Sequence, residues 1–139
     1  MIQSITGRCY CGATKLYSTQ APKTVTYCHC SDCRRVTGAP VAAFAAFDES
    51  ALSVVPNEGK SVSLNPGVTR TFCEICGTSL TGRYSYLPGT VYIALGIIDQ
   101  AEELVPELHG YESNRLSWLN IVDECKRCPG SARDDLNSA

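Results

Sequence analysis

The sequence predicts a mainly β domain of short antiparallel strands with little helix, and two features of the chain support this prediction. Short runs of β-favouring residues alternate with turns that contain Gly and Pro along most of the 139 residues. No repeat of about 20–50 residues and no linker divides the chain, which is too short for two comfortable domains. We therefore expect one β-rich domain around a single apolar core.

Most of the expected strands are short, and each ends at a turn. Residues 13–18 alternate in polarity, and residues 91–95 form the clearest strand because a Pro-Gly turn and a glycine frame them. Residues 41–47 are apolar throughout and fit a buried strand or a helix segment, but their length and the preceding Pro40 favour a strand. The remaining β candidates are residues 24–27, 51–55, 60–64 and 68–72.

Helix is expected in two short segments. Residues 31–37 have the polar, arginine-containing composition of a helical turn that Gly38 closes. Residues 99–104 fit a short helix with Asp99 as its cap. The tail from Cys128 onward is polar and small, and we expect it to fray.

The charge balance of the chain argues against some classes of partner. The chain has 12 basic and 14 acidic residues, so it offers no broad positive surface for nucleic acid or an anionic membrane. Its first residues carry no basic cluster followed by an apolar stretch, and the longest apolar run, residues 41–47, is far shorter than a membrane span. We expect a cytoplasmic protein that must recruit any anionic ligand locally.

Nine cysteines are the most informative feature of the composition. A disulfide framework would need an export signal and usually an even number of cysteines, whereas a reducing compartment favours metal ligation or thiol chemistry. The cysteines fall in four tight groups: Cys9/Cys11, Cys28/Cys30/Cys33, Cys73/Cys76 and Cys125/Cys128.

The first and third groups together predict a structural zinc site. Cys9/Cys11 and Cys73/Cys76 each occupy a tight turn beside an expected strand, and a glycine follows each pair. Such a turn can aim two sulfurs at one point about 2.3 Å from a zinc ion, and two turns complete a tetrahedron. Four buried free cysteines are the simpler alternative, but they would not explain two pairs that are each followed by glycine.

The second group places three cysteines, Cys28, Cys30 and Cys33, within six residues. Three protein ligands and an open position are typical of a catalytic zinc, which could bind a substrate thiol as a thiolate. Arg34 and Arg35 follow at once and could bind an anionic substrate.

Two alternatives for this group stay open. The first is a second structural zinc whose fourth ligand comes from elsewhere in the chain, and the second is a metal-free, redox-active thiol cluster. The candidates for that fourth ligand are His29, His109, Cys125 and Cys128.

Several other polar residues have less specific interpretations. If the loop is extended at His29, its side chain points away from the metal and orients other groups instead of binding. His109 fits an acid–base group or a structural histidine. Four residues near the second cysteine pair could line a pocket or form a solvated face: Arg70, Arg83, Tyr84 and Tyr86.

The order of these motifs resembles the glutathione-dependent formaldehyde-activating enzyme family, which also includes centromere protein V. The resemblance runs from about residue 5 to about residue 122 and covers seven of the cysteines. It rests on Gly7-x-Cys9-x-Cys11-Gly12, Cys28-His29-Cys30-x-x-Cys33-Arg34, Thr37-Gly38-Ala39, Phe72-Cys73-x-x-Cys76-Gly77-Thr78-x-Leu80, Pro106-Glu107-Leu108-His109 and Trp118-Leu119-x-Ile121.

The resemblance implies a β-tent fold with zinc between β-sheets, within a domain of residues 1–124 that a tail of residues 125–139 follows. It implies a structural zinc on Cys9, Cys11, Cys73 and Cys76, and a catalytic zinc on Cys28, Cys30 and Cys33. The family's named activity is the condensation of glutathione with formaldehyde to S-hydroxymethylglutathione, which is a carbon–sulfur lyase reaction in reverse. Many members have no established substrate.

The chain departs from the family pattern at Cys125-Lys126-Arg127-Cys128, a pair that has zinc-knuckle spacing but no partner pair. We expect two tail thiols, which Lys126 and Arg127 could activate, although one of them could instead close the second zinc site. The functional hypothesis is a zinc-dependent carbon–sulfur lyase-like enzyme whose partner is a small thiol such as glutathione. The alternatives are a non-catalytic zinc-binding interaction module and a redox or metal-handling protein.

Overall fold

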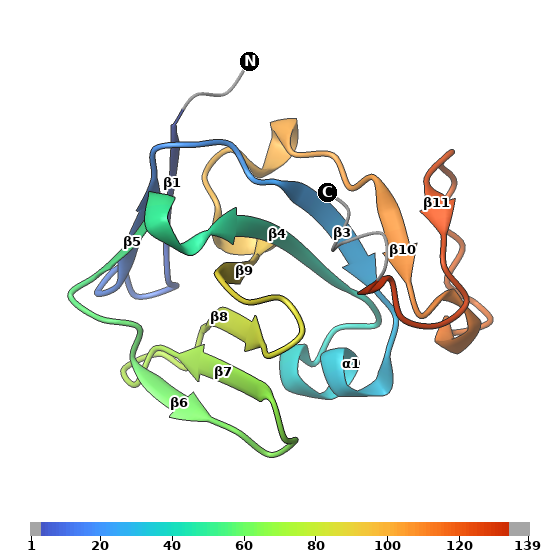
Figure 1. The fold of residues 1–139 in the computed structure, drawn as a ribbon, viewed down its shortest axis with the longest axis horizontal. Coiled ribbons are helices and arrows are strands. Elements are labelled where there is room, and N and C mark those ends of the chain that lie inside the picture. The colour runs from blue at the N-terminus through green and yellow to red at the C-terminus, as the bar shows by residue number, and fades with distance from the viewer. Residues whose placement is uncertain (1–3, 134–139) are drawn as a thin grey trace.

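The computed structural model describes residues 4–133 and shows a mainly β protein with one α-helix, as expected (Figure 1). The strands form a three-stranded sheet, in the order β1-β2-β5, and an eight-stranded sheet, in the order β11-β10-β3-β4-β9-β8-β7-β6. The strands are β1 (Ile5–Arg8), β2 (Lys15–Ser18), β3 (Thr24–Cys28), β4 (Ala42–Asp48), β5 (Leu52–Val55), β6 (Lys60–Val62), β7 (Val68–Phe72), β8 (Ser79–Tyr84), β9 (Thr90–Ala94), β10 (Leu108–Gly110) and β11 (Lys126–Arg127). The helix is α1 (Ser31–Thr37), and short 3-10 turns cover Glu49–Ala51, Leu95–Ile97, Ala101–Glu103 and Glu112–Asn114.

The main core lies between the small sheet and one face of the large sheet. Ile5 of β1 and Leu16 of β2 pack with Phe47 of β4 and Ile93 of β9, and all four are almost fully buried. Figure 1 shows the small sheet, with β1 and β5, at one end of the molecule beside β4. Burial of these side chains supplies the apolar contact that holds the two sheets together.

The apolar run at residues 41–47 forms β4, which is buried on both faces. Ala45 and Phe47 face the core shared with the small sheet. Ala42, Phe44 and Ala46 face the other side, where they pack near the start of α1. A strand buried on both faces needs no polar alternation, which explains why this segment lacks the period of two.

The C-terminal end of β3, at Cys28, is followed within three residues by the first residue of α1. Cys30 is the N-cap of the helix, and its sulfur accepts a hydrogen bond from the amide of Cys33 at 3.2 Å. Gly38 ends the helix with φ 71, a left-handed conformation that glycine adopts without strain, and its N–H donates to Arg34 O. Sequence therefore predicted this helix correctly, both in its position and in its termination.

The second expected helix, at residues 99–104, is reduced to the 3-10 turn Ala101–Glu103. Its cap is Gln100, not Asp99, because the Asp99 carboxylate accepts a hydrogen bond from the hydroxyl of Thr6 instead. The prediction of Asp99 as a helix cap is therefore wrong.

Two short strands at the edge of the large sheet run parallel to their neighbours. β10 pairs with β3, and β11 pairs with β10, whereas the strand pairings elsewhere in residues 4–133 are antiparallel. The register places His109 opposite both Tyr27 and Arg127. This edge brings the C-terminal part of the chain against the end of β3, beside the second cysteine group. The expectation that the tail frays from Cys128 onward is wrong for residues 128–133, because Cys128 and Ala132 are buried against Leu108. Residues 134–139 lie outside the described residues.

Candidate metal centres

The first candidate centre is a four-cysteine cluster made of Cys9, Cys11, Cys73 and Cys76. The four sulfurs all lie within 4.8 Å of one another. Cys11 Sγ lies 3.5 Å from Cys9 Sγ and 3.9 Å from Cys73 Sγ. Sulfurs bound tetrahedrally at about 2.3 Å from zinc lie about 3.8 Å apart, so these separations fit a zinc ion.

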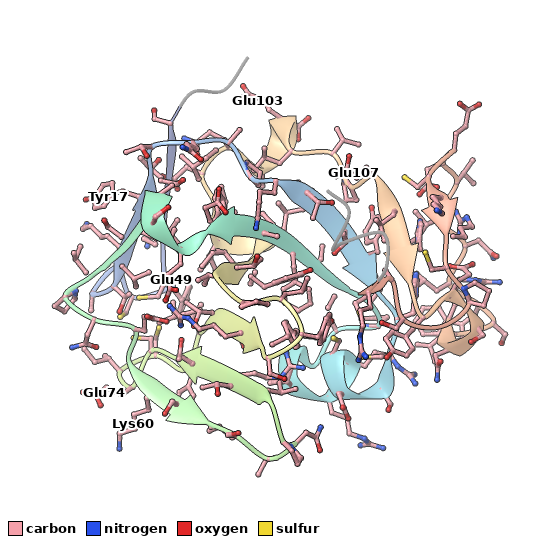
Figure 2. All side chains as sticks on the ribbon, in the orientation of Figure 1. Tyr17, Glu49, Lys60, Glu74, Glu103 and Glu107 are labelled. Carbon is pink, nitrogen blue, oxygen red and sulfur yellow. The ribbon has the colours of Figure 1, made fainter. Side chains whose placement is uncertain are left out.

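Each of the two turns that carry these cysteines is closed by the amide of a glycine. The amide of Gly12 donates to Cys9 O at 3.1 Å, and the amide of Gly77 donates to Cys73 O at 2.8 Å. Both glycines have positive φ, 82 and 80 respectively, which a residue with a side chain adopts only with strain. These turns direct both cysteines of each pair toward one point. Figure 2 shows Glu74, at the tip of the second turn, pointing away from the protein.

Polar hydrogens already face the sulfurs of this cluster. The amide of Thr14 lies 3.3 Å from Cys9 Sγ, and the hydroxyl of Thr78 lies 3.1 Å from Cys76 Sγ. Hydrogen bonds from Thr78 lower the pKa of Cys76 to about 5. The cluster is therefore prepared to carry the negative charge that thiolate ligands bring to a metal ion.

The second candidate centre is a three-cysteine cluster made of Cys28, Cys30 and Cys33. Cys28 ends β3, Cys30 caps α1, and Cys33 lies in the first turn of the helix, so a single loop brings the sulfurs within 4.8 Å of one another. Contacts with its two neighbours hold the pKa of Cys30 far below its usual range, and the same contacts raise those of Cys28 and Cys33. A cation among the sulfurs would allow all three to ionise together, so this donor set fits zinc.

Among residues 4–133, the metal-capable group at this loop contains these three cysteines and no fourth ligand. His29 points instead toward His109 and Glu112, in line with the expectation that its side chain turns away from the cysteines. The thiol of Cys125 donates to Pro106 O at 3.1 Å, and Cys128 packs with Leu108 and Ala132. The fourth ligand that a second structural zinc would require is therefore not in place.

The surroundings of Cys125 raise the pKa of its thiol. Burial and the neighbouring Asp123 carboxylate raise its pKa, and they outweigh the effect of Arg127. For Cys125, this direction is opposite to the activation expected from Lys126 and Arg127. The carboxylate of Asp123 raises the pKa more than Arg127 lowers it.

A cavity of about 410 Å³ opens over the three-cysteine cluster. Its wall includes all three cysteines and Arg70. The wall also includes three aromatic side chains and a second cation: Tyr84, Tyr86, Tyr92 and Arg133. Its volume is in the usual range for small-molecule sites. A neighbouring cavity of about 460 Å³ is also lined by Arg70, but no cysteine lines it, so a ligand there would not contact the cysteine sulfurs.

The cations of the cysteine cavity are held by aromatic rings. Arg70 Nη1 donates to the hydroxyl of Tyr84 at 3.2 Å, and its guanidinium lies 5.6 Å from the centre of that ring. Arg133 lies 4.3 Å from the centre of the Tyr86 ring. Contacts of this kind orient a guanidinium without neutralising it, so they leave its positive charge in place.

Arg34 and Arg35 do not line this cavity. They border a different hollow, with Pro40 and Leu116, and Arg35 also borders the neighbouring cavity of about 460 Å³. A helix turns its successive residues in different directions, and Cys33 takes the direction of the cluster. Arg70 was one of several residues with an undecided role in the sequence, and the exposed, near-terminal Arg133 carried no sequence signal at all.

Tyr92 supplies an unpaired hydroxyl at the cavity wall. Its ring is 5% exposed, and no group among the described residues hydrogen bonds with its Oη atom. Burial raises the pKa of Tyr92, so the phenol stays protonated and can donate a hydrogen bond. Composition and spacing alone gave no reason to select this residue.

Within residues 4–133 there is no helix that is both long and apolar enough to cross a membrane.

A comparison with curated proteins found no match. A solved structure of a protein from Rhodobacter sphaeroides is similar in fold, with a TM-score of 0.54 and 22% sequence identity over 88% of this chain and 99% of that one. The family model for the glutathione-dependent formaldehyde-activating enzyme matches residues 4–114, which contain both cysteine clusters. The chain therefore belongs to the family of glutathione-dependent formaldehyde-activating enzymes.

Proposed function

We propose that this protein is a zinc-dependent carbon–sulfur lyase-like enzyme that acts on the adduct of a small thiol, with glutathione and formaldehyde as the first substrates to test. The observation that carries the proposal is the convergence of Cys28, Cys30 and Cys33 on the wall of a cavity that also contains the guanidinium groups of Arg70 and Arg133. In this proposal the four-cysteine cluster holds a structural zinc, and the three-cysteine cluster holds a catalytic one. Zinc bound there would act as a Lewis acid that favours the thiolate form of a substrate thiol.

Charge balance indicates which thiols the cavity would favour. Three thiolates around a divalent cation leave one net negative charge, which repels a further anion. Arg70 and Arg133 offset that charge at the cavity wall. Glutathione carries two carboxylates as well as its thiol, so it matches a site where cations lie close to a thiol-binding position.

The proposed reaction joins the thiol to the aldehyde without any redox change. The thiol loses its proton, its sulfur forms a bond to the aldehyde carbon, and the carbonyl oxygen gains a proton to become a hydroxyl group. We assign Tyr92 to hydrogen bond with that oxygen, because its phenol is protonated, buried and without a partner among the described residues. The reverse sequence cleaves the carbon–sulfur bond.

The cellular setting proposed for this chemistry is the cytoplasm. Cysteine clusters of this kind bind metal as thiolates, which a reducing compartment preserves.

The direct test is turnover by zinc-loaded protein. We expect faster formation of S-hydroxymethylglutathione from glutathione and ¹³C-formaldehyde than in protein-free buffer, followed by NMR. A Tyr92→Phe variant keeps the ring and removes the hydroxyl, so it should keep thiol binding and lose rate. If glutathione neither reacts faster nor binds at millimolar concentration, the weight moves to another thiol or to a non-catalytic zinc module.

Replacing Arg70 by Ala should weaken glutathione binding by about 1.5–3 kcal/mol, because a charge-assisted hydrogen bond is lost in a partly buried cavity. Isothermal calorimetry on zinc-loaded protein measures this loss. Arg35→Ala is the matched control, since Arg35 is exposed and outside the cysteine cavity. Equal loss in both variants would indicate that overall charge, and not a contact with Arg70, controls the affinity.

A further inference from the structure

A buried polar cluster that neither cysteine site uses lies between the end of β3 and the C-terminal edge of the large sheet. It contains two histidines, His29 and His109, and both are 0% exposed. Their ring planes are within 13° of each other with centres 5.1 Å apart, and His29 Nε2 lies 2.8 Å from His109 Nδ1, so the two rings meet edge to edge. Neutral histidines are seldom buried completely without a partner for each nitrogen, yet His29 Nδ1 has no hydrogen-bond partner among residues 4–133.

Glu112 presents an unpaired oxygen to both rings. Its Oε1 atom accepts hydrogen bonds from Arg115 Nε at 3.1 Å and Arg127 Nη1 at 3.0 Å. Its Oε2 atom is buried and has no hydrogen-bond partner among residues 4–133. That oxygen lies 3.5 Å from His29 Nε2 and 3.6 Å from His109 Nδ1. The two arginines fix the carboxylate so that its free oxygen points at the two ring nitrogens.

We propose that His29, His109 and Glu112 bind a divalent transition-metal cation such as zinc, as a third metal site separate from both cysteine clusters. The three donor atoms form a triangle with edges of 2.8, 3.5 and 3.6 Å. Nitrogen and oxygen donors on one tetrahedral zinc lie about 3.3 Å apart, and a point about 2 Å from all three atoms exists near this triangle. The edge between the histidines must open by about half an ångström, and both rings must turn toward the ion, because their nitrogens now face each other along the line between the ring centres.

The surroundings of His109 support a metal ligand. His109 Nε2–H donates to Asp123 Oδ2 at 2.8 Å, which leaves the lone pair of Nδ1 facing His29 Nε2, with Glu112 Oε2 3.6 Å away. A carboxylate behind a histidine is the usual means by which proteins orient such a ligand and raise its basicity. Asp123 is itself fixed, because its Oδ1 accepts from Arg127 Nη2 at 3.0 Å.

The donor set indicates the kind of ion. Two imidazole nitrogens and one carboxylate oxygen suit zinc, iron(II), cobalt(II) and similar cations, and they suit calcium or magnesium poorly. Three ligands leave open coordination positions. Arg115 and Arg127 lie close, but carboxylates of Glu112 and Asp123 pair with them, so their charge is largely offset. The alternative is a metal-free hydrogen-bonded network that anchors the C-terminal edge.

The test is a cobalt titration of protein whose cysteine clusters are already filled with two equivalents of zinc. We expect one further cobalt per chain by elemental analysis. Its visible bands should lack the sulfur-to-cobalt charge transfer that cysteine ligands produce. In long-range ¹H–¹⁵N spectra of the wild-type protein, addition of cobalt should shift the resonances of the imidazole nitrogens of His29 and His109.

Glu112→Gln keeps the shape and an oxygen acceptor for the arginines but removes the anionic ligand, so cobalt affinity should fall at least tenfold. Glu124→Gln is the control, because Glu124 is exposed, follows Asp123 in the chain and lies outside the cluster. Absence of a third equivalent, unchanged imidazole signals, or equal affinity in both variants would overturn the proposal. None of these outcomes depends on glutathione turnover, so the two proposals fail separately.

Discussion

Replacing Cys73 by Ser is expected to unfold most of the protein at room temperature. Cys73 is almost fully buried, and its sulfur lies 3.9 Å from that of Cys11, a residue from a turn that is distant in sequence. A structural zinc contributes on the order of 10 kcal/mol or more of apparent folding free energy, while a domain of this kind is stable by only about 5–15 kcal/mol. Loss of one ligand from a closed site removes much of that contribution.

The measurement combines thermal unfolding with zinc content. Wild-type protein should lose its cooperative transition when a strong chelator removes the metal, and the Cys73→Ser variant should resemble that state without a chelator. Cys125→Ser is the matched control, because Cys125 is only half-buried and belongs to neither cysteine cluster. A Cys73→Ser protein that keeps its transition temperature would refute the structural assignment of the four-cysteine cluster.

Local signals explain the parts of this fold that could be predicted from sequence. The segment from Cys28 to Gly38 contains its own ligands, helix cap and helix stop, so its structure depends little on the rest of the chain. The cysteine turns are also local, because a glycine with positive φ follows each pair. Both clusters could therefore be located before any tertiary contact was known.

The parts that could not be predicted depend on long-range pairing. β10 consists of three residues, and its place beside β3 follows from contacts such as Leu108 with Thr26, which are far apart in sequence. Without that pairing, His109 cannot be placed beside His29. Strands this short have too few residues to show a period of two.

Substrate-binding residues were harder to predict than metal ligands for a related physical reason. Sequence proximity favoured Arg34 and Arg35, but α1 carries them away from the cavity that contains the cysteines. The cavity instead receives Arg70 from β7 and Arg133 from the C-terminal segment. Metal ligands reveal themselves by residue type and spacing, whereas a cavity is assembled from elements whose packing the sequence does not state.

Replacing Cys30 by Ser should have a large effect of the opposite kind, because activity should be lost while the fold remains. The cysteine side chain caps α1 through a hydrogen bond from the amide of Cys33. Serine is one of the preferred residues at this position, so the cap survives the substitution. A serine hydroxyl is a poor zinc ligand in comparison with a thiolate, so the three-cysteine cluster should lose its metal.

We expect the Cys30→Ser protein to bind one zinc ion fewer than wild type and to keep its thermal transition within a few degrees. Its kcat/KM for the proposed condensation should fall by more than the roughly 10–100-fold seen when groups behind a metal ligand are changed. Cys33→Ser should have a similar effect on metal content and activity, and the double variant should be no worse than either, because the three thiolates act as one unit. If Cys30→Ser instead unfolds the protein while Cys73→Ser leaves it folded and inactive, the structural and catalytic assignments of the two clusters must be exchanged.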